Sequence, residues 1–492
     1  GEEFQDDTHP YSYDLDIFGS HSLYQYINRT HTFLGRKTLA AHFLSPKADE
    51  IPHLQAVTQE LSTEENDIVL IDKNQDLIDR LLNKFDIMGI CGNGASYDIL
   101  VEAGVENCDI FISVTEMDEI NIIASILAKK IGAEYTVARV RNPEYSQQLQ
   151  LVRESLGISL LINPELSTAR DIANNFNYPS ALSVENFVGN RVSLLELEIN
   201  EGSRLAGLSL KEVRNRFESI LICVIHRNEQ SFIPDGDSTL EAGDHVYITG
   251  AYPDLRNFLK LTGQETKSVS SAVIVGGGRI TYYLLNMLKQ TKIDTKVIEV
   301  NEERSETLSY AFPHTTVIHA DGTDHDVLEE QRITEYDVFV SMTGIDEENL
   351  ILSAYAKQQG VQKIITKMSR PALLKVFKGF DSQSVVTPKH IVANEIIQFV
   401  RSRSNTQGSN VEALYRLADN QVEALQFRVQ KNSAICGIPL SELKTKSNLL
   451  IAFIVRGQQL IYPAGNDTIE PFDKVIVVTT EKDFDDINDI LE

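Results

Sequence analysis

A duplication within the chain constrains its fold more than any other feature. Residues 94–100 (GASYDIL) align with residues 322–328 (GTDHDVL), and residues 109–115 (DIFISVT) align with residues 337–343 (DVFVSMT), both at an offset of 228 residues. Self-similarity at one fixed offset indicates repeated structural units. The chain is therefore expected to contain two copies of one unit, preceded by an unrelated segment.

Runs rich in β-branched residues alternate with helical patterns in each copy. In the second copy, strands are predicted at residues 272–275, 296–300, 316–318 and 338–342, with helices from about residue 280 and near Glu302 between them. Strands separated by helical stretches imply βαβ crossovers and a parallel, doubly wound sheet. The predicted fold class is α/β, with two doubly wound, Rossmann-like parallel-sheet domains, each followed by a small α+β module.

The small modules come from a second, shorter repeat, in which residues 203–210 align with residues 433–440. Residues 191–250 and 421–480 each carry two or three alternating apolar strands, a short helix and a turn, which is typical of a β-rich α+β module. The predicted units are residues 1–62, 63–180 (a truncated Rossmann-like domain), 181–265 (the first small module), 270–400 (the second Rossmann-like domain) and 411–492 (the second small module). A Ser/Asn/Gly-rich linker is predicted at residues 401–410.

Composition excludes several classes of protein. The 45 Lys and Arg residues against 71 Asp and Glu residues give a formal net charge of −26, which argues against contacts with nucleic-acid phosphates. The apolar run at residues 449–455 is far shorter than the roughly 20 residues of a membrane span, and no signal-like start is present, so a soluble protein is expected. The four cysteines form no C-x-x-C pair, so neither a disulfide framework nor a metal site is predicted.

A glycine loop in the second copy carries the clearest chemical signal. Residues 276–281 (GGGRIT) follow the strand at residues 272–275, where a dinucleotide-binding fold turns from its first strand into its first helix. Gly276 permits the tight turn and Gly278 lets the backbone approach a phosphate, which the unpaired N–H groups of the helix start can bind. Thr281 departs from the pattern, which has glycine or alanine there. A structural turn without a ligand is the alternative interpretation.

Further polar residues follow the next strands of the same copy. Glu299 ends the second strand 21 residues after Gly278, where a carboxylate can accept both ribose hydroxyls. Asp321 and Gly322 follow the third strand, and Thr343 follows the fourth. Since the carboxyl ends of parallel strands meet at one edge of a sheet, this ordered set favours a nucleotide site over a bare structural turn.

The first copy keeps only part of this pattern. Asp72 follows the strand at residues 68–71, and Gly94 and Thr115 are also retained, but no strand followed by G-x-G precedes Asp72. The phosphate-binding loop and the first central strand are therefore predicted to be missing. Either the first site no longer binds, because the phosphates have no backbone N–H donors to replace their water, or ribose binding survives weakly without a phosphate anchor.

At these residues the chain resembles the TrkA-type regulatory subunits of bacterial Trk potassium uptake systems, which are built from tandem RCK (or KTN) nucleotide-binding domains and RCK C-terminal domains. The resemblance covers about residues 66–492. It rests on residues 69–74 (VLIDKN), 138–143 (ARVRNP) and 162–165 (INPE) in the first unit, and on residues 276–278 (GGG), 298–299 (IE), 321–324 (DGTD) and 463–465 (PAG) in the second.

The resemblance implies a cytoplasmic homo-oligomer, a dimer or a tetramer, that lies on the inner face of the membrane beneath a potassium-translocating subunit. Its regulatory ligand would be NAD(H) or ATP/ADP. Carried over residue by residue, the nucleotide-binding candidates are Asp72, Gly94, Thr115 and Arg139 in the first domain, and Gly276, Gly278, Arg279, Glu299, Asp321, Gly322, Thr343 and Lys367 in the second. Lys367 stands where the first copy has Arg139.

The first 62 residues do not fit this family. Residues 9–19 (HPYSYDLDIFG) and 22–30 (SLYQYINRT) resemble a fragment of the core that precedes the ATPase of MutS-family mismatch-repair proteins. The phosphate-loop signature G-x-x-x-x-G-K-[ST] is absent from the chain, so ATP hydrolysis is not predicted. Five histidines in this segment (His9, His21, His31, His42 and His53) lie ten to twelve residues apart, which favours scattered surface positions over a metal site.

The function predicted from the sequence is nucleotide-sensing regulation of a Trk-type potassium transporter, without catalysis. No His/Asp or Ser/His/Asp constellation accompanies the nucleotide-site residues, so no catalytic residue is predicted. Two alternatives remain. An NAD-dependent oxidoreductase would need a substrate domain larger than the small modules, and a MutS-related fusion without its ATPase would need nucleic-acid contacts that the net charge disfavours.

Overall fold

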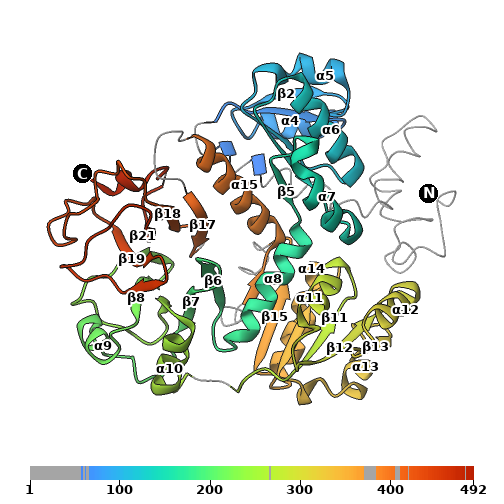
Figure 1. Cartoon of the computed structure of the whole chain (residues 1–492). Coiled ribbons are helices and arrows are strands. Elements are labelled where there is room, and N and C mark those ends of the chain that lie inside the picture. Colours follow the sequence, from blue (N-terminus) through green and yellow to red (C-terminus); the bar gives the residue numbers. More distant parts are fainter. Residues whose placement is uncertain are drawn as a thin grey trace. The chain divides into compact units, whose positions relative to one another are not determined.

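The computed structural model describes residues 57–58, 61–62, 66–264, 267–370, 384–404, 411–418, 420–482 and 484–492 (Figure 1). The chain divides into two units, Gly1–Gln55 and Ala56–Glu492, and the fold described below is that of the second. The MutS-like segment predicted at residues 1–62, with its five histidines, lies outside the described residues except for residues 57, 58, 61 and 62.

The second Rossmann-like domain has a six-stranded parallel sheet. Its strands are β11 (Ser271–Val275), β12 (Asp294–Glu299), β13 (Thr316–His319), β14 (Val338–Ser341), β15 (Lys363–Lys367) and β16 (Ser384–Val386), in the order β13-β12-β11-β14-β15-β16. Its helices include α11 (Arg279–Leu288), α12 (Glu302–Ala311), α13 (His325–Glu330) and α14 (Asp346–Gln358). Because β11 is buried on both faces, Ala272 and Ile274 pack into one core while Val273 and Val275 pack into another. The predicted α/β class is confirmed.

The first Rossmann-like domain has a divided sheet. Strands β1 (Val69–Asp72) and β2 (Met88–Cys91) form one parallel pair, and β3 (Ile110–Ser113), β4 (Tyr135–Arg139) and β5 (Leu160–Ile162) form a separate parallel sheet. Helices α4 (Gln75–Leu82), α5 (Tyr97–Glu102), α6 (Asp118–Ile131) and α7 (Pro143–Leu156) connect these strands. The two groups match β12–β13 and β14–β16 of the second domain. Among the described residues nothing corresponds to β11, so β1 and β3 each keep an unpaired edge.

Each small module is a five-stranded antiparallel sheet. The first contains β6 (Ser183–Phe187), β7 (Val192–Glu198), α9 (Leu210–Arg216), β8 (Leu221–Arg227), β9 (Gln230–Phe232), β10 (His245–Gly250) and α10 (Tyr252–Thr262). The second contains β17 (Val411–Leu417), β18 (Val422–Arg428), β19 (Leu449–Arg456), β20 (Gln459–Ile461) and β21 (Lys474–Thr479). The α-helix predicted in the second module is wrong for the described residues, which include only a 3₁₀ turn at Ile487–Ile490.

A buried carboxylate explains part of the shorter repeat. Asp244 accepts two hydrogen bonds from Arg227, at 2.6 and 2.7 Å, and the equivalent Asp473 accepts from Arg456 at 2.8 Å. Both aspartates are 1% exposed. Charge-assisted pairs of this bidentate form are strong and directional, so each module retains the same acid at the same place.

Two long helices are exchanged between the halves of the chain. Helix α8 (Pro164–Asn177) leaves the first domain and packs on α11, where Ala169, Ile172 and Phe176 join the core of the second domain. Helix α15 (Pro388–Ser404) leaves the second domain and packs into a core that contains Val137 and Ile162 of the first. The two helices also contact each other (Figure 1). The halves are therefore bound through a shared hydrophobic interior.

The exchange corrects the linker predicted at residues 401–410. Residues 401–404 form the end of α15, and residues 405–410 lie outside the described residues. Arg401 is 3% exposed and pairs with Glu423 of β18 at 2.8 Å, and Arg416 contacts the same carboxylate at 3.3 Å. Polar residues at the end of an amphipathic helix resemble a linker in sequence, and only their burial against β18 distinguishes the two.

Lys363 joins the halves at a second place. Its ammonium group is buried beside three acceptors, the Ala181 carbonyl at 2.5 Å, the Ser384 hydroxyl at 2.6 Å and the Asn175 side chain at 3.2 Å. Burial lowers the pKa of Lys363 from 10.5 to about 7. Because Asn175 and Ala181 belong to the first half, this amine ties the end of α8 to the edge of the second sheet.

Two exclusions from the sequence bear on the fold. All four cysteines are free thiols, and Cys223 is the one that is fully buried. In the part of the chain that the structure describes, no helix is both long and apolar enough to cross a membrane.

We expect replacement of Lys363 by Met to flatten the pH dependence of stability. Between pH 7 and 10.5 the unfolded chain holds a proton at this amine that the folded chain lacks, so folding stability rises with pH across this window. Below pH 7 both states are protonated and the cost of the buried charge is fully present. Chemical unfolding at several pH values measures the slope. The matched control, Lys296→Met at a partly exposed lysine of the same sheet, should keep the wild-type slope.

We also expect Glu423→Gln to destabilise the second module by about 3 kcal/mol, because it leaves two buried guanidinium groups without their shared counter-charge. Denaturant titration of the full chain provides the measurement. The control is Glu470→Gln, since Glu470 is half exposed and its partner Arg456 retains Asp473. Equal stability of the two variants would contradict the importance assigned to the buried pair.

Candidate functional site

The glycine loop forms a tight turn against the end of β14. Gly276 has a φ of +105°, and a Cβ atom there would lie 2.6 Å from the carbonyl oxygen of Met342. Side chains rarely adopt this backbone conformation, and the space is occupied by backbone rather than by a movable side chain. Glycine is therefore required at this position by the fold itself, before any ligand is considered.

Gly278 is glycine for a different reason. It is the N-cap of α11, makes no side-chain cap, and a Cβ atom there would meet nothing within 4 Å. The first N–H groups of an α-helix lack partners within the helix, and together with the helix dipole they form an anion-binding end. The open space in front of Gly278 is thus where a phosphate can approach the backbone.

Thr281 fits the loop despite its departure from the glycine pattern. Its side chain is fully buried, and its hydroxyl donates a hydrogen bond to the Gly276 carbonyl. The hydroxyl fastens the turn from inside the first helical turn. This residue supports the loop and does not disrupt it.

Glu299 supports the loop from the neighbouring strand. It is 4% exposed; one carboxylate oxygen accepts from the Gly277 N–H at 2.5 Å and the other from the Asn301 N–H at 2.8 Å. A carboxylate offers about four lone-pair directions, so these two hydrogen bonds do not exhaust the acceptor capacity of Glu299. The sequence predicted a ribose contact and did not foresee that this acid also shapes the turn.

Asp321 and Gly322 lie at the end of β13. Asp321 is exposed, and its carboxylate accepts from the backbone N–H and the hydroxyl of Thr323 at 2.9 and 2.7 Å. Gly322 faces Val275, and a Cβ atom there would overlap that side chain. Gly322 therefore has a packing role beside β11, and Asp321 is the member of this pair whose charge can reach a ligand.

Thr343 and Lys367 are held together by an asparagine that the site prediction omitted. Asn349 accepts from the Thr343 N–H at 2.8 Å and donates to the carbonyls of Thr343 and Lys367 at 3.2 and 3.1 Å. The Lys367 ammonium donates to the Thr343 carbonyl at 2.7 Å. The side chain of Asn349 thus links the carboxyl ends of β14 and β15.

The first copy repeats this device. Asn121 accepts from the N–H and the hydroxyl of Thr115, both at 2.7 Å, and donates to the Arg139 carbonyl at 2.9 Å. Asn121 and Asn349 are both fully buried. The signal that could have found them was available, since the two stand at the same offset of 228 residues as the rest of the repeat.

The remaining first-copy candidates form an incomplete site. Asp72 ends β1, and its carboxylate accepts from the Asn74 N–H at 2.7 Å. Gly94 has open space, since a Cβ atom there would meet only Ile71 at 3.9 Å. Asp72 and Thr115 end strands that are not paired with each other, and the described residues contain no glycine loop between them. The first copy therefore has the acid that corresponds to Glu299 and the threonine that corresponds to Thr343, but it lacks a glycine loop among the described residues.

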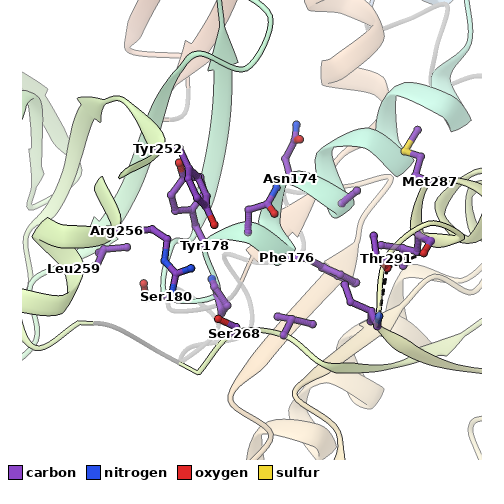
Figure 2. Close-up of a pocket in the computed structure, with 16 residues that line it drawn as sticks. Asn174, Phe176, Tyr178, Ser180, Tyr252, Arg256, Leu259, Ser268, Met287 and Thr291 are labelled. Carbon is purple, nitrogen blue, oxygen red and sulfur yellow. Dashed lines mark hydrogen bonds between the residues drawn. The ribbon is translucent and has the colours of Figure 1, made fainter. Parts of the chain in front are cut away.

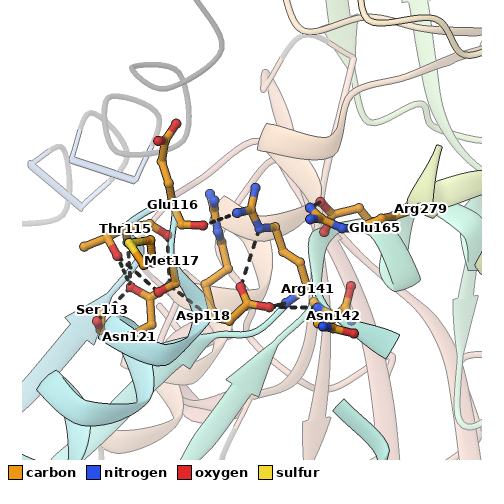
Figure 3. Close-up of polar contacts among 12 residues, drawn as sticks. Ser113, Thr115, Glu116, Met117, Asp118, Asn121, Arg141, Asn142, Glu165 and Arg279 are labelled. Carbon is orange, nitrogen blue, oxygen red and sulfur yellow. Dashed lines mark hydrogen bonds and ion pairs between the residues drawn. The ribbon is translucent and has the colours of Figure 1, made fainter. Parts of the chain in front are cut away.

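A cluster of charges joins the first copy to the glycine loop of the second (Figure 3). Arg279, the first residue of α11, lies 3.9 Å from Glu165 at the start of α8. Glu165 interacts electrostatically with Arg141, Arg139 and Arg279, and burial raises its pKa above the usual range. Arg279 was predicted to serve only the second domain, and the structure places it between the two.

Several buried atoms of this cluster make no hydrogen bond among the described residues. They are Arg139 Nε, Arg141 Nε, Asp118 Oδ1 and Glu165 Oε2. Of these, Arg141 Nε and Asp118 Oδ1 form an ion pair with each other at 3.6 Å. Arg139 is 4% exposed, and burial, followed by repulsion from Arg141, lowers its pKa to about 10. Both guanidinium groups lie among the carboxylates of Asp118 and Glu165, so the cluster is a buried network of mixed charge in which the Arg139 Nε has no hydrogen-bond partner among the described residues.

One exposed group on α13 could ligate a cation. His325, Asp326 and Glu329 have ligand atoms within 4.8 Å of one another, and all three residues are exposed. The sequence analysis did not predict this cluster. Exposed side chains on a helix of one and a half turns are not held in place for coordination, so the cluster does not define a site.

Comparison with protein families matches both predicted unit types. The TrkA-N domain matches residues 54–164 and 272–388, and the TrkA-C domain matches residues 194–263 and 424–492. The Trk system potassium uptake protein TrkA homolog 1 of Methanosarcina mazei is 30% identical over 420 residues, which cover 84% of this chain and 92% of that protein. The Trk system potassium uptake protein TrkA of Halomonas elongata is 30% identical over 430 residues, 87% of this chain and 93% of that protein.

Solved structures agree with the fold. The GsuK RCK domain matches with a TM-score of 0.55 at 15% identity, over 87% of this chain and 90% of that one. The GsuK channel bound to NAD matches with the same score and identity, over 87% of this chain and 75% of that one. The comparisons do not support the MutS resemblance of residues 1–62, and the first TrkA-N match already begins at residue 54.

We expect Gly278→Asp to abolish nucleotide binding in the second domain without unfolding it. The added side chain meets open space, and aspartate is a favoured N-cap, but its charge lies where a phosphate must bind. Affinity should fall by at least about a hundredfold, about 3 kcal/mol. Calorimetric titration with NADH measures the affinity, and thermal unfolding monitors the fold.

Gly276→Ala is the matched comparison within the same loop. It places a Cβ atom against the Met342 carbonyl and should cost about 1–3 kcal/mol of stability. If both variants bind NADH like the wild type, the glycine loop is not the nucleotide site.

Proposed function

The chain belongs to the TrkA family of Trk-system potassium uptake proteins, and on that basis we propose that it is a nucleotide-sensing regulatory subunit. It binds NAD(H) or ATP/ADP through the second Rossmann-like domain and controls a Trk-type potassium-translocating membrane subunit, without catalysing a reaction. It acts as a homo-oligomer, a dimer or a tetramer, at the cytoplasmic face of the membrane. The NAD ligand is supported by the GsuK channel, a protein of the same fold that has been solved with NAD bound.

The observation that carries the proposal is the arrangement of Gly278, the start of α11 and Glu299 in the second domain, which we call the cradle. Open space in front of Gly278, the free end of α11 and the buried Glu299 carboxylate lie together at the carboxyl edge of the sheet. These groups are complementary to a phosphate and a ribose, respectively. Asp321, Thr343 and Lys367 stand on the adjoining strand ends and supply the remaining walls.

The first domain takes no part in phosphate binding in this proposal. Asp72, Gly94 and Thr115 are in place, but neither a glycine loop nor a central strand stands between them in the described residues. Without backbone N–H donors, a phosphate loses more hydration than it regains. One nucleotide per chain is therefore expected.

Nucleotide binding reaches the rest of the chain through Arg279. This residue begins the helix that holds the phosphate and faces Glu165, which begins the exchanged helix α8. Because the Arg279 side chain is 52% exposed, its ion pair with Glu165 contributes at most about 1 kcal/mol to stability. A charge-assisted hydrogen bond to phosphate contributes about 1.5–3 kcal/mol, so a phosphate competes successfully for the guanidinium.

When Arg279 turns to the phosphate, Glu165 in the first turn of α8 loses this ion pair. This helix packs on α11 and leads directly into β6 of the first small module. Two nucleotides that draw Arg279 away to different degrees favour different relative positions of module and domain. Only their difference in affinity for the two arrangements can act on a transporter.

The test is calorimetric titration of the full chain with NADH and then with ATP, followed by potassium uptake in cells that carry a Trk-type membrane subunit but lack their own regulatory subunit. We expect one NADH site per chain, no consumption of NADH over time, and uptake that Gly278→Asp impairs.

Each alternative outcome of this test is informative. Two sites per chain would show that the first domain binds without its loop. No binding, or uptake restored equally by wild type and Gly278→Asp, would refute the sensing role.

A further inference from the structure

A second pocket lies away from the glycine loop, where three parts of the chain meet (Figure 2). It has a volume of about 300 Å³ and is lined by the end of α8, by α10, by the end of α11 and by residues 268 and 269 before β11. The glycine loop is at the opposite end of α11, a helix of ten residues, which is about 15 Å away at 1.5 Å per residue.

The charge of the lining is unusual for this chain. Among the described residues, sixteen line the pocket, and these include Arg256 and no aspartate or glutamate, in a chain with 71 acidic residues and a net charge of −26. Arg256 acts electrostatically on the Tyr178 hydroxyl, whose pKa is raised by burial to about 12. Tyr178 is thus neutral at physiological pH, and its hydroxyl donates to the Ser193 hydroxyl oxygen at 3.4 Å.

The lining also offers an unused polar atom and apolar walls. Ser180 Oγ is buried without a hydrogen-bond partner among the described residues. One wall holds the rings of Tyr178 and Tyr252, which meet edge to face at 5.5 Å. The opposite wall is apolar and is formed by Phe176, Met287, Leu288 and Ile293. Polar side chains, among them Asn174, Asn177 and Thr291, also line the pocket, and its volume is at the lower end of the range of small-molecule sites.

We propose that this pocket binds a small organic anion, a carboxylate or phosphate monoester with an apolar body, as a second effector site. The anionic group lies near Arg256 and the Ser180 hydroxyl, and the apolar body lies between the two walls. Because the ligand contacts the first domain through α8, the first small module through α10 and the second domain through α11, it holds one relative arrangement of these parts. The proposal does not depend on nucleotide sensing.

The experiment is calorimetric titration of the full chain with phenyl phosphate, and with benzyl alcohol as the uncharged analogue. We expect saturable binding of one phenyl phosphate per chain and at least tenfold weaker binding of benzyl alcohol. Arg256→Gln should weaken phenyl phosphate at least tenfold. The matched control Arg216→Gln, which removes an exposed arginine from α9 of the same module, should leave the affinity unchanged.

Two further variants separate the sites and guard against misfolding. Ser268→Trp adds bulk at an exposed lining position and should block phenyl phosphate even if Arg256→Gln fails to fold. Gly278→Asp should leave phenyl phosphate binding intact, since the probe would otherwise be occupying the nucleotide cradle. No saturable binding, equal binding of benzyl alcohol, loss in Gly278→Asp, or unchanged binding in both Arg256→Gln and Ser268→Trp would each overturn the proposal.

Discussion

The exchange of α8 and α15 is the interaction on which the rest of the structure depends. Helix α8 buries Ile172 in the core of the second domain, and α15 buries Ile396 in a core formed mainly by the second small module together with Val137 and Ile162 of the first domain. Burying one large aliphatic side chain contributes about 1.5–3 kcal/mol, so several such residues per helix exceed any single polar contact between the halves. The two duplicated units therefore share hydrophobic cores and are not independent domains joined by a linker.

The position of α8 also connects a weak polar contact at its start with residues at its end. The ion pair between Arg279 and Glu165 contributes little to stability, yet it stands where the helix that follows the glycine loop meets the first residues of α8. At the far end of α8, Asn175 and Ala181 hold the buried Lys363 amine, and the pocket between α8, α10 and α11 opens beside them. Helix α8 thus runs from the ion pair with Arg279 at its start to the Lys363 contacts and the pocket at its end.

Much of the candidate nucleotide site could be predicted because its elements are local in sequence. A strand, three glycines and an acid one strand later stand at intervals set by βαβ geometry, so Gly276, Gly278 and Glu299 were found from spacing and lie together in the structure. Asn121 and Asn349 were overlooked although the repeat aligned them, since an asparagine inside an apolar helical pattern looks like an ordinary helix residue. Their role depends on strand ends that only the folded sheet brings within hydrogen-bond distance, such as the carbonyls of Thr343 and Lys367.

By itself the sequence determined the duplication, the α/β class, the intact glycine loop of the second copy and its absence from the first, because periodicity and turn chemistry act between residues close along the chain. Only the tertiary structure decided which sheet each exchanged helix covers, that residues 401–404 end a helix, and that Arg279 faces Glu165. These outcomes pair residues that are distant along the chain, 22 positions apart for Arg401 and Glu423 and 114 for Arg279 and Glu165. Many such pairings are compatible with the same amphipathic pattern. The total apolar area buried in the folded chain selects among them, and this total cannot be read from any short stretch of sequence.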